Sequence, residues 1–498
     1  MKLSENQIVI SKEFKETKNS ININAVAGSG KTTMLLLLLS FVPKGKTALF
    51  VAFNNSIVDE LKNRTDRTDV DIMTIHSYGW RCILRHYRNV KMNPDKAIAK
   101  TGEVLKKYIE SQEVAPKKKG YYFYLVPKMI NLLRCNLLEN TIDNILALAE
   151  HHCEEISDFD AKIIKEVFDR MEKDTKQFDF TDMIYQPNVS PYLKFKKYDY
   201  VFCDESQDFS LAQQGIINGA LNRKGRLITV GDPNQAIYGF AGADAESYDR
   251  ISSLKSNAVS LPLSVCYRCA KRIVEEAQKI VPHISYYSEA EEGEVKWGDL
   301  MSIQPGDWII CRNLKPLVQV CLWLLKNRIK SKIRGKDIGE GLLGLINKVG
   351  AKTLSGLAGG LKAQTILLEK KLRAKGIKSP SLHPKMEVLL QKIEVLELLS
   401  DEVTTVTQLK SVIEDMFTEE VKGILLSTIH KAKGLENDRI YFLCPELLPS
   451  KFAVLPWQLA QEENLKYVAI TRAKKSLIYV SGEDFKDNIK KRIPKFSI

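Results

Sequence analysis

The chain has 498 residues, which is too long for one compact core, and its length predicts about three or four domains. Hydrophobic residues make up 44% and charged residues 27%, an ordinary composition for a soluble globular protein. Lys and Arg number 74 against 61 Asp and Glu, and the formal net charge is +13. This excess favours a polyanionic partner such as nucleic acid, with a generally basic solvated surface as an equal alternative.

The sequence disfavours a secreted or membrane protein. The first ten residues, MKLSENQIVI, lack the apolar core of a signal peptide, and the most apolar run, 34–39, is too short to span a bilayer. Nine cysteines are scattered with one C-x-x-C pair, Cys266 and Cys269, a pattern typical of reduced core thiols rather than a zinc site. We expect the cytoplasm or another intracellular compartment that contains DNA, and no membrane partner.

Apolar, β-rich runs separated by helical stretches predict two parallel-sheet α/β blocks. A mainly helical, charged stretch from about 82 to 180 interrupts the first block, and another from about 340 to 420 interrupts the second. The expected strands lie at 21–26, 47–53, 70–75, 198–204, 226–232, 307–312, 423–429, 439–445 and 476–482.

The stretch AVAGSGKTT, residues 25–33, follows the first expected strand and precedes an apolar helix. This is the context of a phosphate-binding loop, in which Gly28, Ser29 and Gly30 turn backbone N–H groups toward an anion. Lys31 would reach the β- and γ-phosphates, and the Thr32 hydroxyl would hold Mg²⁺. Ala25 replaces the usual first glycine, which is tolerated if that backbone needs no positive φ.

The second half of a nucleotide site follows another expected strand, in VFCDESQD. Asp204 and Glu205 stand at its carboxyl end, where parallel sheets bind ligands. Asp204 is placed to hold Mg²⁺, and Glu205 to orient and deprotonate the attacking water. A polar turn after a strand is common, but together with the lysine loop this pair indicates a nucleoside triphosphatase site.

From Gln7 to about Val480 the chain resembles the superfamily 1 DNA helicases of the UvrD/Rep type, as a compact member. The stretches that carry this resemblance occur in the family's order and are LSENQ, VAFNNSIVDEL, TIHS, DESQD, VGDPNQAIYGFAGA, LSVCYRC, STIHKAKGLE and YVAITRAKK.

The resemblance implies two RecA-like P-loop domains and ATP with Mg²⁺ as nucleotide and metal. The implied domains are 1A (1–85 and 181–262), helical insertion 1B (86–180), 2A (263–340 and 421–498) and helical insertion 2B (341–420). Beside the loop residues, the implied nucleotide contacts are Gln7 on the adenine edge, Thr33, Tyr267 stacking on the base, and Glu436.

The resemblance further implies catalytic roles for Gln235, Arg268 and Arg472. Gln235 would sense the γ-phosphate. The two arginines lie in the second block and would stabilise the transferring phosphoryl group when the blocks close on ATP. A solvated surface arginine is the simpler interpretation of either one alone.

The implied contacts to single-stranded DNA include aromatic side chains near strand ends, which suit base stacking, although such aromatics are also typical of a core. His430 could equally be a structural histidine. The implied DNA-binding residues are Phe53, Asn54, Thr74, His76, Tyr238, Phe240, Thr428 and His430. Two positions depart from the family pattern: Ala241 replaces a common arginine, and Ser56 replaces a common lysine.

We therefore expect an ATP-dependent DNA helicase and translocase that moves 3′ to 5′, the polarity being carried over from the resemblance. The expected partners are single-stranded DNA, duplex junctions and a protein loading partner, and no fused nuclease is expected. One alternative is a translocase that strips bound proteins or annealed strands without processive unwinding. The other is a nucleotide-gated binding platform. Stacking alone does not distinguish RNA from DNA.

Overall fold

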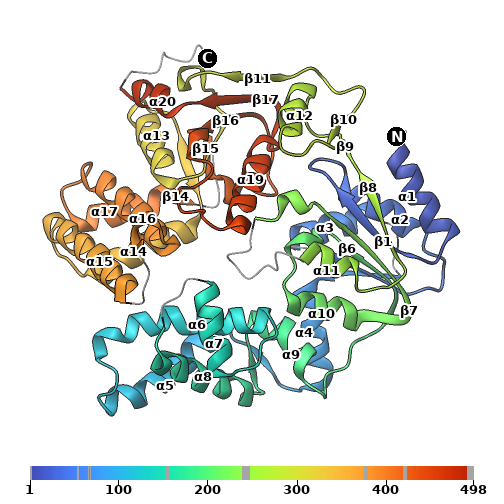
Figure 1. Ribbon diagram of the computed structural model, residues 1–498, viewed down its shortest axis with the longest axis horizontal. Helices are drawn as coiled ribbons and strands as arrows, with labels where there is room; N and C mark the ends of the chain where they lie inside the picture. The colour runs from blue at the N-terminus through green and yellow to red at the C-terminus, as the bar shows by residue number, and fades with distance from the viewer. Residues whose placement is uncertain are drawn as a thin grey trace. The chain divides into compact units, whose positions relative to one another are not determined.

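The computed structural model describes residues 3–52, 55–65, 67, 69–152, 156–237, 247–374, 379–418 and 423–490. The chain divides into two compact units, residues 1–264 and 265–498, and each is built on its own parallel sheet. The predicted α/β fold class, with two RecA-like sheets and helical insertions, is confirmed (Figure 1).

Unit 1 alternates strands and helices, with a run of helices inserted after α4. Its elements are α1 (Glu5–Glu16), β1 (Ser20–Ala25), α2 (Lys31–Ser40), β2 (Ala48–Ala52), α3 (Asn55–Arg64), β3 (Val70–Thr74), α4 (Ile75–His86), β4 (Lys91–Met92), α5 (Lys96–Glu110), α6 (Lys119–Cys135), α7 (Ile142–His151), α8 (Asp158–Lys173), β5 (Gln177–Phe178), α9 (Phe180–Val189), β6 (Tyr198–Cys203), α10 (Leu211–Ala220), β7 (Leu221–Gly231), α11 (Ser247–Ser252) and β8 (Ala258–Leu263).

Unit 2 has the same alternation around its own helical insertion. Its elements are β9 (Val265–Cys266), α12 (Lys271–Gln278), β10 (Ser285–Tyr286), β11 (Glu294–Trp297), β12 (Trp308–Cys311), α13 (Leu314–Lys326), β13 (Ser331–Arg334), α14 (Lys336–Val349), α15 (Leu354–Ala374), α16 (Pro384–Ser400), α17 (Val406–Met416), β14 (Phe417–Thr418), β15 (Ile424–Thr428), α18 (Ile429–Ala432), β16 (Asn437–Leu443), α19 (Pro456–Ile470), β17 (Ala473–Val480) and α20 (Gly482–Asn488).

The sheet of unit 1 has the order β3-β2-β6-β7-β1-β8, and all neighbouring strands pair in parallel. Its strands are apolar on both faces because helices cover both. Along β2, Phe50 packs in the core formed with α1 and α2, while Leu49 and Val51 pack in the core formed with α4, α9 and α10. The sheet is therefore the middle of three layers. The loops that follow its strands lie at its carboxyl edge.

The edge strand β8 was not expected from the sequence. It carries Pro262, whose backbone nitrogen has no hydrogen to donate to a neighbouring strand. Because β8 lies at the edge of the sheet and pairs with β1 on one side, the proline is tolerated there. Two further short strands, β4 and β5, pair in parallel inside the stretch expected to be mainly helical, where no strand was predicted. Strands of two residues are too short to give a periodic signal.

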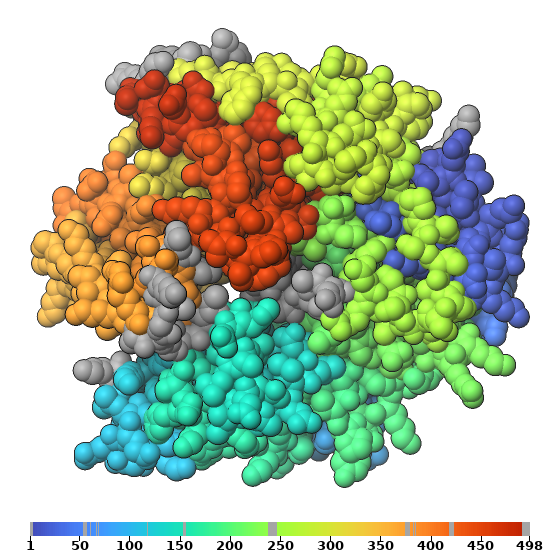
Figure 2. Space-filling view, viewed as in Figure 1, coloured from blue at the N-terminus to red at the C-terminus, as the bar shows by residue number. Residues whose placement is uncertain are grey.

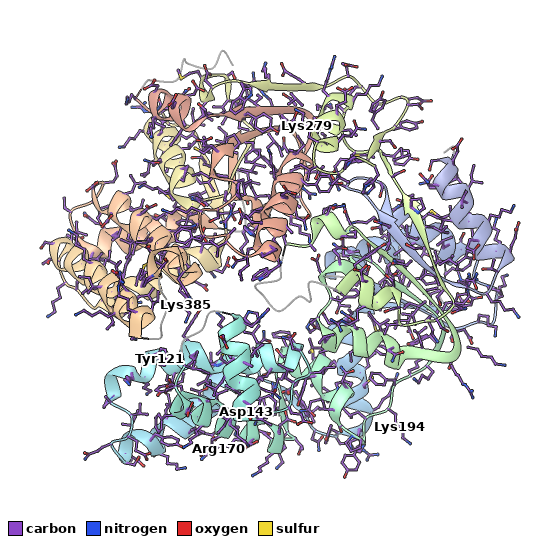
Figure 3. The ribbon with its side chains drawn as sticks, in the orientation of Figure 1. Tyr121, Asp143, Arg170, Lys194, Lys279 and Lys385 are labelled. Atoms are coloured by element: carbon purple, nitrogen blue, oxygen red, sulfur yellow. The ribbon has the colours of Figure 1, made fainter. Side chains whose placement is uncertain are left out.

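The inserted helices α5, α6, α7 and α8 of unit 1 share one apolar core, which includes Leu105, Leu133 and Ile164. Figure 2 shows the outer surface of these helices in cyan. On that outer side the polar residues pair locally. Arg170, labelled in Figure 3, donates to Glu166 one turn earlier on α8 at 2.8 Å.

A buried cluster of charges attaches this insertion to α9, which packs on α4 and α10. Lys96 of α5 donates to Asp182 at 2.9 Å, and Arg134 of α6 donates to Asp179 at 3.1 Å. Asp179 and Asp182 also form the capping box that begins α9. Arg134 also lies 3.3 Å from Asp182, and neither basic side chain is more than 1% exposed, so the two carboxylates share these two cations for neutralisation.

The sheet of unit 2 has the order β11-β17-β16-β12-β15-β13-β14, again parallel throughout. One continuous core joins β12, β15 and β16 to α13 and to the insertion helices α14, α16 and α17. A largely buried arginine, 13% exposed, anchors this insertion as well. Arg312, directly after β12, makes bonds of 2.8 and 3.1 Å to Glu462 of α19 and lies 3.4 Å from Glu387 of α16.

Replacing Lys96 with Met is expected to lower the free energy of unfolding of unit 1 by about 3–5 kcal/mol, because the buried Asp182 would lose its 2.9 Å partner and keep only Arg134, at 3.3 Å, beside Asp179. Denaturant titration followed by a probe in the insertion measures the loss. Lys106→Met is the matched control, since the Lys106 side chain is 78% exposed beside Glu110 and its loss should change stability by no more than about 0.5 kcal/mol. Equal effects of the two substitutions would contradict the role given to the buried pair.

Candidate nucleotide site

The strand order of the first sheet places three loops that carry predicted site residues side by side. Strand β7 lies between β6 and β1, so the carboxyl ends of all three meet at one edge. The loop after β1 carries Lys31 and Thr32, the loop after β6 carries Asp204 and Glu205, and the loop after β7 carries Gln235. Residues 174 positions apart are thereby brought within hydrogen-bond distance.

The loop between β1 and α2 has the backbone of an anion cradle. Gly28 and Gly30 have φ of 67° and 78°, the left-handed region that glycine adopts without strain, and α2 begins directly after Gly30. Ala25 is the last residue of β1 and extended, which explains why alanine is tolerated there. The Ser29 hydroxyl is fully buried and finds no hydrogen-bond partner among the residues that the structure describes, which leaves it available to a ligand of the loop.

Lys31 and Glu205 form an ion pair across the sheet edge, with Nζ 2.8 Å from Oε2. Burial lowers the pKa of Lys31, but the carboxylates of Glu205, Asp232 and Asp204 outweigh it and the net shift is upward. Glu205 itself has φ of 53°, an uncommon conformation for a residue with a side chain. The lysine is thus held fully charged at the mouth of the cradle.

Thr32 and Asp204 form the second pair, with the threonine Oγ1 donating to Asp204 Oδ2 at 2.6 Å. Burial, followed by the nearby charge of Glu205, raises the pKa of Asp204 to about 6. A hydroxyl and a carboxylate are the hard oxygen donors that Mg²⁺ prefers, so the residues present fit the predicted metal. Within the described ranges, no group of three or more His, Cys, Asp or Glu side chains is placed to hold a metal by itself, so phosphates and water would complete the coordination.

Two residues at this edge were missed by sequence reasoning, Gln207 and Asp232. Gln207 Nε2 donates to Glu205 Oε2 at 2.7 Å, and its Oε1 accepts from Asp232 N at 3.1 Å. The Asp232 carboxylate accepts from Gln235 Nε2 at 2.6 Å. The signal that could have found them is the pair of polar clusters, DESQD and GDPNQ, each directly following one of two neighbouring strands.

The predicted base contacts lie in both units. In unit 1, Gln7 is buried, and its Oε1 accepts from Ser4 N at 3.0 Å, which closes the capping box of α1 and fixes the side chain. The Thr33 hydroxyl accepts from Arg64 Nη2 at 3.0 Å. In unit 2, the Tyr267 ring packs against Tyr287 with centroids 5.1 Å apart.

The two predicted catalytic arginines of unit 2 are held by groups of that unit. Arg268 Nε lies 2.5 Å from Glu436 Oε2, which brings two predicted site residues together. Arg472 is 1% exposed and donates to the carbonyl oxygens of Val468 and Leu435. Both guanidinium groups are therefore fixed in orientation by their own domain.

The tripeptide Thr-Ile-His occurs at the same strand-to-helix junction in both units. Thr74 ends β3 and caps α4 by accepting from Ser77 N, while Thr428 ends β15 and caps α18 by accepting from Lys431 N. Burial lowers the pKa of His76. Burial, with smaller contributions from Arg312 and Lys431, lowers the pKa of His430 to about 3.

Five positions of the sequence analysis lie outside the described residues: Phe53, Asn54, Tyr238, Phe240 and Ala241. The side chain of Ser56 is likewise not described. Their assigned roles stay predictions. Among the helices that the structure describes, none combines the length and the apolar character needed to cross a membrane.

A glycine-rich loop after the first strand, a strand-end acidic pair and a second parallel sheet define a P-loop nucleoside triphosphatase of RecA-like fold. A family model for the UvrD/REP helicase N-terminal domain matches residues 7–255, and one for the UvrD-like helicase C-terminal domain matches residues 363–483. The chain belongs to the UvrD/Rep helicase family, which confirms the resemblance.

The curated relatives are proteins described as ATP-dependent DNA helicase PcrA. The protein from Bacillus subtilis (strain 168) is 25% identical over 309 residues, which cover 56% of this chain and 40% of the relative. Those from Staphylococcus epidermidis (ATCC 35984) and Staphylococcus aureus (Mu50) are 25% identical over 300 residues, or 55% of this chain and 40% of each relative. The matched region thus spans about two fifths of the length of these relatives.

His430 is expected to stay neutral from pH 8 to pH 5, because its pKa of about 3 leaves the imidazole uncharged throughout that range. The ring carbon and nitrogen chemical shifts of His430, assigned by comparison with a His430→Gln variant, should stay constant over the titration. A midpoint near the ordinary histidine value of about 6.5 would show that burial does not control this side chain.

Proposed function

We propose that this protein is an ATP-dependent DNA helicase and translocase that moves 3′ to 5′ along single-stranded DNA and unwinds duplex. Family membership supports the class of activity. The observation that carries the proposal is the paired arrangement of Lys31 with Glu205 and Thr32 with Asp204 at one sheet edge. Direction, strand preference and partners rest on the resemblance.

In the proposed reaction Lys31 exchanges Glu205 for the β- and γ-phosphates of ATP. Glu205, released from its ion pair, accepts a proton from the attacking water. Thr32 and Asp204 would hold Mg²⁺, which supplies charge neutralisation on the phosphates when bound. Gln235 would sense the γ-phosphate, and Arg268 and Arg472 would stabilise the charge of the transferring phosphoryl group.

The nucleotide base is proposed to meet Gln7 and Tyr267, with Thr33 and Glu436 as further contacts. The strand is proposed to stack on Phe53, Tyr238 and Phe240, an interaction worth about 1–3 kcal/mol for each base. The remaining proposed strand contacts are Asn54, Thr74, His76, Thr428 and His430. Because His430 is neutral, it would contribute a hydrogen bond rather than a positive charge.

The proposed domain limits are those of the sequence analysis, namely 1A at 1–85 and 181–262, 1B at 86–180, 2A at 263–340 and 421–498, and 2B at 341–420. The proposed partners are single-stranded DNA, duplex junctions and a protein that loads the enzyme, and the proposed location is an intracellular compartment that contains DNA.

The test is steady-state ATP hydrolysis without polymer, with single-stranded DNA and with single-stranded RNA of equal length. Stimulation by DNA is expected. Glu205→Gln should lower DNA-stimulated kcat by about 10²–10⁴-fold, because it removes the general base, and Lys31→Ala should abolish turnover. Ser40→Ala, an exposed hydroxyl at the far end of α2, is the control that should leave turnover unchanged.

Near-normal turnover by Glu205→Gln would overturn the assignment of the base. Absence of hydrolysis in all three conditions would favour a nucleotide-gated platform over a motor. Tailed duplexes of each polarity, run beside a protein-blocked single strand, distinguish unwinding from stripping. A tail preference opposite to the proposed direction would overturn the polarity, and stronger stimulation by RNA would overturn the choice of strand.

A further inference from the structure

Gln207 is a buried amide at the centre of the nucleotide site. It lies two residues after Glu205 in the short turn between β6 and α10 and is 2% exposed. Its Nε2 donates to Glu205 Oε2 at 2.7 Å and to Asp208 Oδ2 at 3.2 Å, while its Oε1 accepts from Asp232 N at 3.1 Å. Both ends of the amide are therefore engaged by backbone or carboxylate groups.

The same oxygen of Glu205 has two donors, Lys31 Nζ at 2.8 Å and Gln207 Nε2 at 2.7 Å. A bound triphosphate competes for the lysine, because its negative charge exceeds that of one carboxylate. It does not compete in the same way for Gln207, whose neutral amide is already held by Asp232. After the lysine leaves, Gln207 remains a hydrogen-bond donor to the Glu205 carboxylate.

Packing around Gln207 leaves its amide little freedom to move. A Cβ atom at Gly231 would lie 2.9 Å from Gln207 Oε1 and 2.6 Å from Ser206 Oγ, so only glycine fits beside it without displacement. The residue after this glycine, Asp232, begins the turn that carries Gln235. Gln207 thus connects the end of β6 to the loop that follows β7.

The connection continues to the proposed γ-phosphate sensor. The Asp232 carboxylate is fully buried and accepts from Asn234 N at 3.1 Å and from Gln235 Nε2 at 2.6 Å. Movement of Gln207 would therefore displace both the base and the turn that presents the sensor. A misplacement of about 1 Å in such a group can lower a rate by about 10²-fold.

We infer that Gln207 is a positioning residue for ATP hydrolysis, whose amide holds the Glu205 carboxylate and the Asp232–Gln235 turn in one geometry after nucleotide draws Lys31 away. This role rests on the proposed function, since it needs Glu205 to act as the base. Gln207 acts through Glu205 and Asp232 and is assigned no contact with the nucleotide.

The test is Gln207→Met, which keeps the length of the side chain and removes its hydrogen bonds. DNA-stimulated kcat is expected to fall about 10- to 100-fold while KM for ATP changes little, because base orientation and not binding is lost. The acid limb of the kcat profile against pH should also move to higher pH, since loss of a donor favours the protonated carboxyl. A merely structural role would lower the fraction of active enzyme, which reduces apparent kcat but leaves the pH profile unmoved.

Gln214→Met is the matched control. Gln214 is buried to the same degree, and its Nε2 donates to Phe209 O at 3.3 Å and to Ser247 Oγ at 3.2 Å, neither of them a proposed site residue. This variant should lose a similar amount of thermal stability and keep kcat within about twofold of the parent. Gln207→Leu, which removes the hydrogen bonds without adding a charge beside Glu205 and Asp208, serves as a second variant if the methionine form does not fold, and the same loss of kcat is expected.

Unchanged kcat and pH profile in Gln207→Met, or an equal loss in Gln214→Met, would overturn the positioning role. This failure is distinguishable from failure of the proposed function. If the parent hydrolyses ATP and Lys31→Ala does not, the nucleotide site stands and only the role of Gln207 falls. If the parent does not hydrolyse ATP at all, both proposals fall together.

Discussion

The ion pair between Lys31 and Glu205 is the interaction on which the nucleotide site depends. Two opposite charges from loops far apart in sequence meet at 2.8 Å, and the Lys31 side chain is only 12% exposed, so the nearby carboxylate favours its charged form. In this structure the partner of Lys31 is Glu205. In the proposed reaction a triphosphate replaces Glu205 as the partner of the lysine, and this exchange releases the carboxylate to act as the base. Under this proposal, nucleotide binding and activation of the base are the same event.

This pair forms only because the sheet places β7 between β6 and β1 and because all three strands are parallel, so their carboxyl ends coincide. Glycines then determine how closely these loops approach one another. Gly28 and Gly30 let the first loop turn with positive φ, and Gly231 leaves space for Gln207 against the end of β7. The helical insertions are attached by ion pairs instead. The buried Arg134 in unit 1 and the partly buried Arg312 in unit 2 join insertion helices to elements of their own sheet domain through carboxylates.

Much of this was predictable from sequence, for identifiable reasons. Continuous apolar strands such as 48–52 give a strong signal because both faces are buried, and the GSGKT loop and the DE pair are local motifs. What the sequence could not give depends on neighbours in space. Strand β8 was not predicted because it contains Pro262, a residue that a sheet tolerates only in an edge strand. The roles of Gln207 and Asp232 exist only because β6 and β7 are adjacent, a fact of strand order. The burial that leaves His430 neutral likewise depends on packing.

The most direct test of this exchange is the equilibrium affinity for a non-hydrolysable ATP analogue, compared between the parent and Glu205→Gln. If Lys31 must leave Glu205 to bind phosphate, removing that carboxylate's charge frees the lysine, and the variant should bind the analogue more tightly than the parent. Weaker binding by Glu205→Gln, approaching that of Lys31→Ala, would contradict the account, because it would mean that Glu205 supports phosphate binding rather than competing with it.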